Sequence, residues 1–296
     1  DYIAAIYPNG TIIASATTKA GNQAVVQAAF DSLNETHFVI ECFGDYAYLN
    51  DSITMPDKLV WFNNHLCYYP LPGYSHEIAV AFKFDSVASS KYGTVRLYDV
   101  FIDGNDKTRF VNGINLSRIQ NSKIYSLYVL HCKSHGVILH DDSWWNTIIG
   151  LDTYDNKGYG LSMSAGPNDK PNANNFVSCH FSCDDTGGVL NSAGEGNTFD
   201  MCHVDSAGSA YYIQDDGNVI TNGFIEVCIN GFYVGTASRA VNGLSLYNNR
   251  LYGITNSLTM VNTTANSIIL EGNTDDAVSI DSWHGWNTGT GSLQSI

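Results

Sequence analysis

The sequence predicts an all-β fold, a parallel β-helix in which the chain coils into a stack of similar turns. Asparagine recurs every 21 to 28 residues, and a period in this range is typical of stacked repeats. A strand-like segment, a turn, a small residue and a second strand follow each of these asparagines. Each repeat therefore has room for two or three short strands and no helix. The recurring residues are Asn121, Asn146, Asn174, Asn197, Asn218, Asn242 and Asn266.

Residues 1–36 are predicted to form a hairpin followed by a capping helix. The strand-like segments Tyr2–Ile6 and Thr11–Ala16 flank the turn sequence Pro8-Asn9-Gly10. The next segment, Asn22–Leu33, places apolar side chains on one helical face. Because the end of a solenoid exposes apolar strand edges, this helix is expected to cover the N-terminal end. Its predicted buried face consists of Val25, Val26, Ala29, Phe30 and Leu33.

Residues 37–282 are predicted to form the stack, so that the chain is one domain overall. Segments 37–43, 46–50 and 58–63 read as its first turns. Residues 64–93 are less regular and are interpreted as a side loop, and Pro167–Pro171 as a second loop. Residues 283–296 are rich in Gly, Ser and Thr and are expected to close or leave the C-terminal end.

The lead-in to the stack carries a resemblance to a known superfamily. An alanine-rich helix, AVVQAAFDSL, precedes the segment FVIECFGDYAYLNDSITMPDKLVWF, and an asparagine ladder follows. This order resembles the pectate-lyase-like β-helix proteins and the related phage tailspike-like modules. The resemblance covers most of the chain and implies a right-handed, single-stranded parallel β-helix that acts on or binds glycans. The Gly-His-Gly and Arg-Ile-Lys motifs of the polygalacturonase type are absent from the sequence.

Composition narrows the range of partners. The net charge of −15 disfavours nucleic acid and anionic membrane surfaces. No apolar run of about 18 residues occurs, so membrane insertion is not expected. The chain starts without methionine, and we expect an extracellular, virion-surface or cell-surface protein from which an N-terminal segment has been removed. Cys179 and Cys202 fall at the same repeat position and are predicted to be buried thiols rather than a disulfide.

The alternation of side chains along a strand predicts which ones face solvent. Positions 5 and 7 after each asparagine are mostly apolar, as in Cys179 and Phe181, and are expected to point inward. Positions 6 and 8 then form one outward wall across neighbouring turns, about 4.8 Å apart. The predicted outward wall consists of Asp152, Tyr154, His180, Ser182, His203, Asp205, Phe224, Glu226, Asn248 and Arg250.

The outward wall is the first candidate site. Asp205 and Glu226 would lie on adjacent turns, at a spacing that suits a glycosidase nucleophile and acid, and Asp152 would lie two turns from Asp205. His180 and His203 could transfer protons or orient a carboxylate. Three aromatic side chains are expected to offer stacking surfaces for sugar rings: Tyr128, Tyr154 and Phe224.

A second candidate lies in the sequence HDDSWWN. His140 and Asp141 stand beside Trp144 and Trp145, which brings a base, an acid and two stacking surfaces into six residues. The other Asp-Asp pairs are interpreted as turn residues that bond their own backbone. No metal-ligand motif occurs, and Ca²⁺ in oxygen-rich turns is the one cofactor that the sequence leaves open.

Three functions remain open at this point. The leading hypothesis is a glycoside hydrolase that uses a carboxylate pair on the outward wall to degrade a polysaccharide or oligosaccharide. The second is a Ca²⁺-dependent lyase or epimerase of uronic acid polymers, with Arg250 as its base. The third is a non-catalytic glycan-binding or virion spike module, assembled as a homotrimer. One fold hosts many functions, so the architecture alone does not decide among them.

Overall fold

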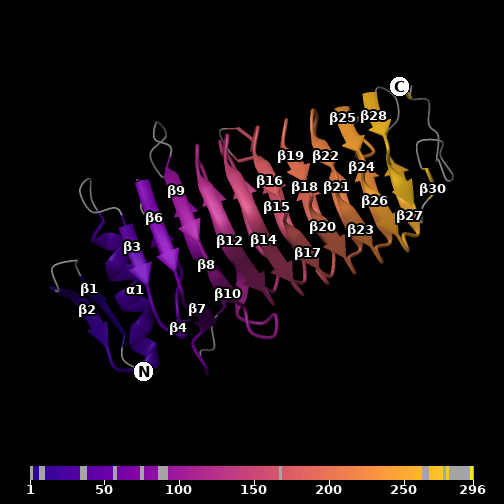
Figure 1. The fold of residues 1–296 in the computed structure, drawn as a ribbon. Coiled ribbons are helices and arrows are strands. Elements are labelled where there is room, and N and C mark those ends of the chain that lie inside the picture. Colours follow the sequence, from indigo (N-terminus) through magenta and orange to yellow (C-terminus); the bar gives the residue numbers. More distant parts are fainter. Residues whose placement is uncertain are drawn as a thin grey trace.

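The chain forms a parallel β-helix, as predicted (Figure 1). The structure is a computed structural model that describes residues 3–6, 11–33, 39–55, 59–73, 77–85, 93–166, 169–261, 267–275, 278–279 and 294–295. Each regular turn contributes one strand to each of three faces, and strands of neighbouring turns pair in parallel. The stack runs from the hairpin and helix at the N-terminal end to β28 at the other end (Figure 1).

The strands of the three faces follow one another along every turn. The first face contains β3 (Val39–Cys42), β6 (Leu59–Asn64), β9 (Thr94–Tyr98), the first halves of β12 (Lys123–Leu130) and β14 (Thr147–Tyr154), β16 (Asn175–Val177), β19 (Thr198–Asp200), β22 (Val219–Thr221), β25 (Asn242–Tyr247), β28 (Ser267–Glu271) and β31 (Gln294–Ser295). The second face contains β4 (Tyr46–Leu49), β7 (Cys67–Pro70), β10 (Phe101–Asp103), the second halves of β12 and β14, β17 (His180–Ser182), β20 (His203–Asp205), β23 (Phe224–Glu226), β26 (Arg250–Tyr252) and β29 (Thr274–Asp275), which also pairs with the antiparallel β30 (Val278–Ser279). The third face contains β5 (Ile53–Met55), β8 (Ile78–Asp85), β11 (Phe110–Ser117), β13 (Val137–His140), β15 (Tyr159–Ser164), β18 (Gly187–Asn191), β21 (Ser209–Ile213), β24 (Asn230–Val234) and β27 (Asn256–Met260).

The N-terminal hairpin and helix are confirmed. Strands β1 (Ile3–Ile6) and β2 (Ile12–Ala16) pair antiparallel, and the turn predicted between them lies outside the described residues. A short 3-10 turn, η1 (Lys19–Gly21), leads into α1 (Asn22–Asp31). Phe30 of α1 contacts the ring of Phe62 in the first turns at a centroid distance of 5.1 Å, so the helix closes the apolar end of the stack. No helix in the described residues is long and apolar enough to cross a membrane.

Two sharp corners limit the short strands β17 and β20 of the second face. Ser178 and Met201 have φ values of 50° and 52° at one corner, directly before the residues that lead into β17 and β20. Cys183 and Ser206 have φ values of 53° and 51° at the other corner, directly after the same strands. Left-handed backbone at both ends turns the chain abruptly. The intervening strands are therefore only three residues long, and their outward side chains are held in a fixed register.

An asparagine ladder stabilises the corner before the first face. The backbone N–H of Asn146 donates to Oδ1 of Asn174 at 3.1 Å, and the N–H of Asn174 donates to Oδ1 of Asn197 at 2.9 Å. Asn197 bonds Asn218 in the same way at 3.0 Å. These asparagines are buried, so each amide satisfies backbone groups that water does not reach.

Three of the recurring asparagines do not extend this ladder. Asn121 precedes the ladder position, which Ser122 occupies and bonds to Asn146 at 2.9 Å. Asn242 was expected to continue it, but the pairing of Val219 with Ser245 places the buried Leu244 opposite Asn218. Asn266 lies outside the described residues.

The interpretation of residues 64–93 as a side loop is wrong for the residues described there. β7 and β8 belong to the stack, where β7 pairs with β10 and β8 pairs with β11. Ala81, Phe82 and Phe84 are buried in the core, and burial of these apolar groups explains why β8 joins the third face. Pro167 and residues 283–293 lie outside the described residues, while Gln294 pairs with Ile269 of β28.

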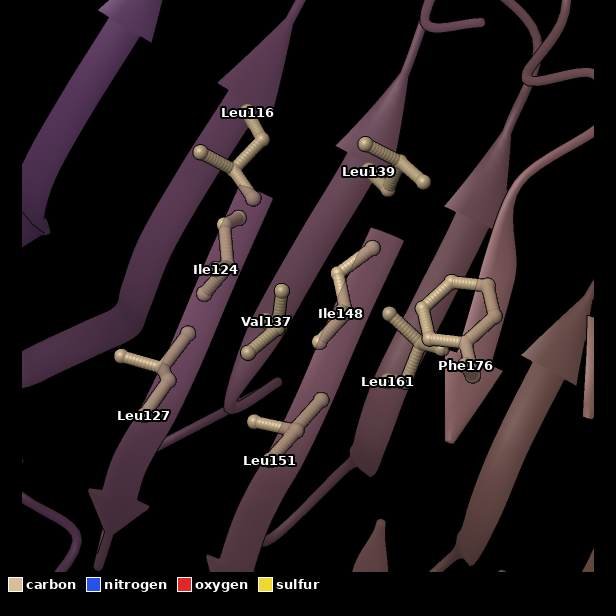
Figure 2. A pocket seen from close by; sticks show the side chains of 9 residues that line it. All are labelled: Leu116, Ile124, Leu127, Val137, Leu139, Ile148, Leu151, Leu161 and Phe176. Atoms are coloured by element: carbon tan, nitrogen blue, oxygen red, sulfur yellow. The ribbon is translucent and has the colours of Figure 1, made fainter. Parts of the chain in front are cut away.

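The interior is a continuous apolar core. Figure 2 shows a small cavity within it, lined only by apolar side chains that the three faces contribute, among them Leu116, Ile148 and Phe176. Cys179 and Cys202 stack inside as free buried thiols, as predicted. The cavity offers no polar group and lies among core side chains.

Candidate functional site: the outward wall of the second face

The side chains predicted for the outward wall come together on the second face. In the pairing of neighbouring turns, Asp152 lies opposite His180, and His180 lies opposite His203. Asp205, two residues after His203, lies opposite Glu226. The strands β14, β17, β20 and β23 stand side by side (Figure 1). The inward residues between these side chains, such as Phe181 and Val204, are fully buried, which confirms the predicted strand register.

Carboxylates and imidazoles alternate along the wall at separations of 3.1 to 3.9 Å. His180 Nδ1 lies 3.4 Å from Asp152 Oδ1, and its Nε2 lies 3.1 Å from Asp205 Oδ2. His203 Nε2 lies 3.2 Å from Glu226 Oε1 and 3.9 Å from Asp205 Oδ2. The result is one connected row of titratable groups across four turns, from Asp152 to Glu226.

Asp205 is the best-supported carboxylate in this row. It accepts a hydrogen bond from Ser182 Oγ as well as from His180. Its side chain is 19% exposed, whereas that of Glu226 is 32% exposed. Asp205 is therefore held in one orientation by two neighbours from the preceding turn, while the carboxylate of Glu226 is more open to a ligand.

The rings of the wall are stacked along the axis of the helix. The centroids of His180 and His203 are 4.8 Å apart, and those of His203 and Phe224 are 5.1 Å apart. The guanidinium of Arg250 lies over Phe224 at 5.9 Å. On the other side of the row, Tyr128 lies opposite Asp152 in the strand pairing. Aromatic side chains therefore border the titratable row at both ends.

The pKa of His180 is raised to about 9. The largest cause is the Asp152 carboxylate beside Nδ1, and Asp205 beside Nε2 adds to it, whereas burial acts in the opposite direction. His180 therefore carries a positive charge at neutral pH. Because its folded pKa lies above its unfolded value, the charge stabilises the fold most fully below about pH 6.5, and this contribution is lost as the pH rises through about 9.

Replacing Asp152 by asparagine is expected to lower the pKa of His180, because the largest cause of the shift is removed. An NMR titration of the imidazole proton resonances measures it. The wild-type advantage in thermal stability over D152N should be greatest near about pH 6 and shrink as the pH rises through about 9. Asp185→Asn is the matched control, since Asp185 pairs with Lys107 at 3.0 Å and not with the row. If the pKa of His180 is unchanged in D152N, Asp152 is not the cause of the raised pKa.

Arg250 and the last outward positions are shifted from the predicted arrangement. Arg250 pairs with Phe224, and Tyr252 pairs with Glu226. Asn248 lies at the corner with a φ of 52° and is not an outward strand residue. Asn242 stands two residues before the position that aligns with Asn218, so a count from Asn242 misplaces Arg250, which is not the direct neighbour of Glu226.

The second candidate site does not join the wall. His140 ends β13 on the third face, and the buried Asp141 lies in the following turn, where its carbonyl accepts a bond from Ser143 N at 2.7 Å. Trp144 pairs with neighbouring turns just before the first face, and its ring lies 6.2 Å from that of the exposed Trp145. These residues are therefore on another side of the coil from Asp205.

Two further Asp-Asp pairs have structural roles. Asp184 is buried in a second ladder and accepts bonds from Asn156 Nδ2 at 2.9 Å and Thr153 Oγ1 at 2.8 Å. Burial raises its pKa to about 7. Asp215 is fully buried beside Lys170 and accepts a bond from the N–H of Asp216, as expected for a turn aspartate. Both carboxylates face protein groups rather than the wall.

One group of polar side chains near the wall was missed by the sequence analysis. His131 Nδ1 lies 2.9 Å from Asp103 Oδ1, and Lys107 bridges Asp155 at 2.6 Å and Asp185 at 3.0 Å. These residues come from consecutive turns at the corner after the second face. The 28-residue separation of Asp103 and His131 was the available signal, since it lies within the range of the repeat length.

The fold has clear structural neighbours although the sequence matches no family model and no curated protein. A protein of Geobacillus virus E2, ORF18, superimposes with a TM-score of 0.63 at 16% identity over 88% of this chain. The match covers 58% of the viral protein. The catalytic domain of a GH87 α-1,3-glucanase, in two aspartate-to-alanine variants in complex with nigerose, matches with TM-scores of 0.52 and 0.51 at 11% identity. Each of these matches covers 95% of this chain and 67% of the glucanase chain. The likeness is one of fold.

Proposed function

We propose that the second face binds a polysaccharide and hydrolyses it with Asp205 and Glu226. The observation that carries this proposal is the row of closely spaced carboxylates and imidazoles, which points outward from four consecutive turns. Clusters of this kind are typical of functional sites.

The two carboxylates have different surroundings, which suits different roles. Asp205 is fixed by His180 and Ser182 and would act as the nucleophile or base. Among the histidines and Ser182 of the wall, only His203 contacts Glu226. Glu226 would donate the proton to the leaving oxygen. Both carboxylates contact His203 Nε2, so their nearest oxygens are at most about 7 Å apart, within reach of both glycosidase geometries.

A neutral glucan is the substrate class that fits best. The net charge of −15 disfavours an acidic polymer, and the glucanase neighbours carry nigerose. Tyr128 and Phe224 border the row on opposite sides and offer ring surfaces for sugar units. A chain bound along the stack would meet successive turns at a spacing of about 4.8 Å, close to the length of one sugar unit.

The test is a screen of the purified protein against neutral and uronic polysaccharides, with α-1,3-glucan included, in the presence and absence of EDTA. Reducing ends and the ultraviolet absorbance of unsaturated product ends are measured together. Reducing ends without that absorbance are expected. Absorbance that EDTA abolishes would overturn the proposal in favour of a Ca²⁺-dependent lyase, for which Arg250 is the candidate base.

A second candidate is a non-catalytic glycan-binding module of a virion spike. The viral origin of one structural neighbour, ORF18 of Geobacillus virus E2, is the observation that supports it. This candidate predicts glycan binding without turnover and a homotrimer in solution at a virion or cell surface. Light scattering coupled to size-exclusion chromatography measures the mass, and a glycan array measures binding. A monomer with turnover would exclude it.

A further inference from the structure

We propose that His180, His203 and Asp205 form a binding site for a divalent transition metal ion of the Zn²⁺ type. One ligand atom from each of the three residues lies within 4.8 Å of the others. His180 Nε2 is 3.1 Å from Asp205 Oδ2, and His203 Nε2 is 3.9 Å from the same oxygen. Ligand atoms of a tetrahedral zinc ion, at bond lengths of 2.0–2.2 Å, stand about 3.3 Å apart. Small side-chain rotations would therefore bring all three to bonding distance.

Two neighbouring carboxylates complete the arrangement. Glu226 Oε1 lies 3.2 Å from His203 Nε2 and offers a fourth ligand. Asp152 Oδ1 lies 3.4 Å from Nδ1 of His180, on the side of the ring away from Asp205. A carboxylate on the second ring nitrogen is the usual support of a metal-bound histidine, because it fixes the tautomer and the ring orientation.

The scaffold permits the movement that metal binding needs. The two imidazole rings are stacked at 15°, so both must tilt toward a common point between their Nε2 atoms. Their Cα positions are fixed by strand pairing and by the left-handed corners at Ser178 and Met201. The adjustment is therefore confined to the side chains, which are about one-third exposed.

The donor set selects the class of ion. Two imidazole nitrogens with one or two carboxylates suit Zn²⁺, Ni²⁺ or Cu²⁺. Ca²⁺ takes six to eight oxygen ligands, and the wall cannot supply them from these three residues. The site stands on side-chain geometry and would hold even if the protein cleaves no polysaccharide, although a bound ion would share Asp205, and Glu226 as its fourth ligand, with the proposed hydrolase.

The experiment is a calorimetric titration of the chelator-treated full chain with Zn²⁺ and, separately, with Ca²⁺. One Zn²⁺ per chain is expected, together with an increase in Tm, because an ion that binds only the folded state stabilises it. His203→Gln and Asp205→Asn should each weaken binding at least about 10-fold, because each removes a ligand. Co²⁺ should give the visible absorption of a tetrahedral site in the wild type and lose it in H203Q.

His131→Gln is the matched control, since His131 is a half-buried histidine paired with Asp103 on the same side of the coil. It should leave Zn²⁺ affinity unchanged. Circular dichroism without metal verifies that each variant folds. If H203Q does not fold, His180→Gln takes its place in the titration. Equal affinities for Zn²⁺ and Ca²⁺, or equal losses in H203Q and H131Q, would overturn the proposal. Neither the calorimetric titration nor the Co²⁺ spectrum uses a polysaccharide. A failure of the metal site is therefore distinguishable from a failure of the proposed hydrolase.

Discussion

Replacing Asp205 by asparagine is expected to reduce the rate of polysaccharide hydrolysis by at least about 1000-fold. Asparagine keeps the size of the side chain and can still bond Ser182, but it can neither attack as a nucleophile nor accept a proton. Glu226→Gln should cause a comparable loss on substrates with poor leaving groups, since its proposed role is to donate a proton. The measurement is kcat on the polysaccharide that the screen identifies.

The matched control for Asp205 is Asp185→Asn, which removes a carboxylate that contacts Lys107 at the neighbouring corner. It should retain nearly full activity. D205N activity within about 10-fold of wild type would reject Asp205 as a catalytic residue. The anomeric form of the first product, read by NMR, then separates a retaining from an inverting reaction, which the spacing of the two carboxylates leaves open.

Replacing Asn174 by alanine is expected to lower the free energy of unfolding by about 3–5 kcal/mol. Asn174 Oδ1 accepts from Asn146 Nδ2 at 2.8 Å, and its Nδ2 donates to Ser143 O at 2.9 Å and Asn197 Oδ1 at 3.0 Å. The substitution leaves several buried polar groups without partners, and each costs about 1–3 kcal/mol. Urea unfolding measures the loss.

Asn242→Ala is the control for this prediction. Asn242 recurs in the sequence like the ladder asparagines, but it is exposed and lies two residues before the ladder position. Its replacement should change the free energy of unfolding by about 0.5 kcal/mol or less. Similar losses in N174A and N242A would show that recurrence in the sequence, rather than position in the ladder, determines the contribution.

Much of the fold follows from the sequence because a parallel stack repeats its own constraints. Cys179 and Phe181 alternate with His180 and Ser182, and one inward column determines every outward side chain beside it. The same logic fails near Arg250, because Asn242 stands two residues before the position that aligns with Asn218. A count from asparagine cannot detect a change in corner length.

The contacts within the site were harder to predict than the positions of its residues. The sequence places Asp205 beside Glu226, but the shared contact with His203 depends on side-chain rotamers. Ser182 was assigned to the outward wall, yet its bond to Asp205 was not anticipated. Lys107 was missed because it reaches Asp155 and Asp185 from a corner of an earlier turn, where no repeat pattern marks it.

The flanking of each short strand by two left-handed corners has a consequence for how such a site can change in length. Every turn presents the same small set of outward positions, and the next turn repeats them about 4.8 Å further along the axis. Duplication or deletion of one complete turn therefore lengthens or shortens the ligand-facing row by one step and leaves the other steps intact. The length of the recognition surface therefore changes only in steps of one whole turn. The outward side chains of each turn can change independently of those of neighbouring turns.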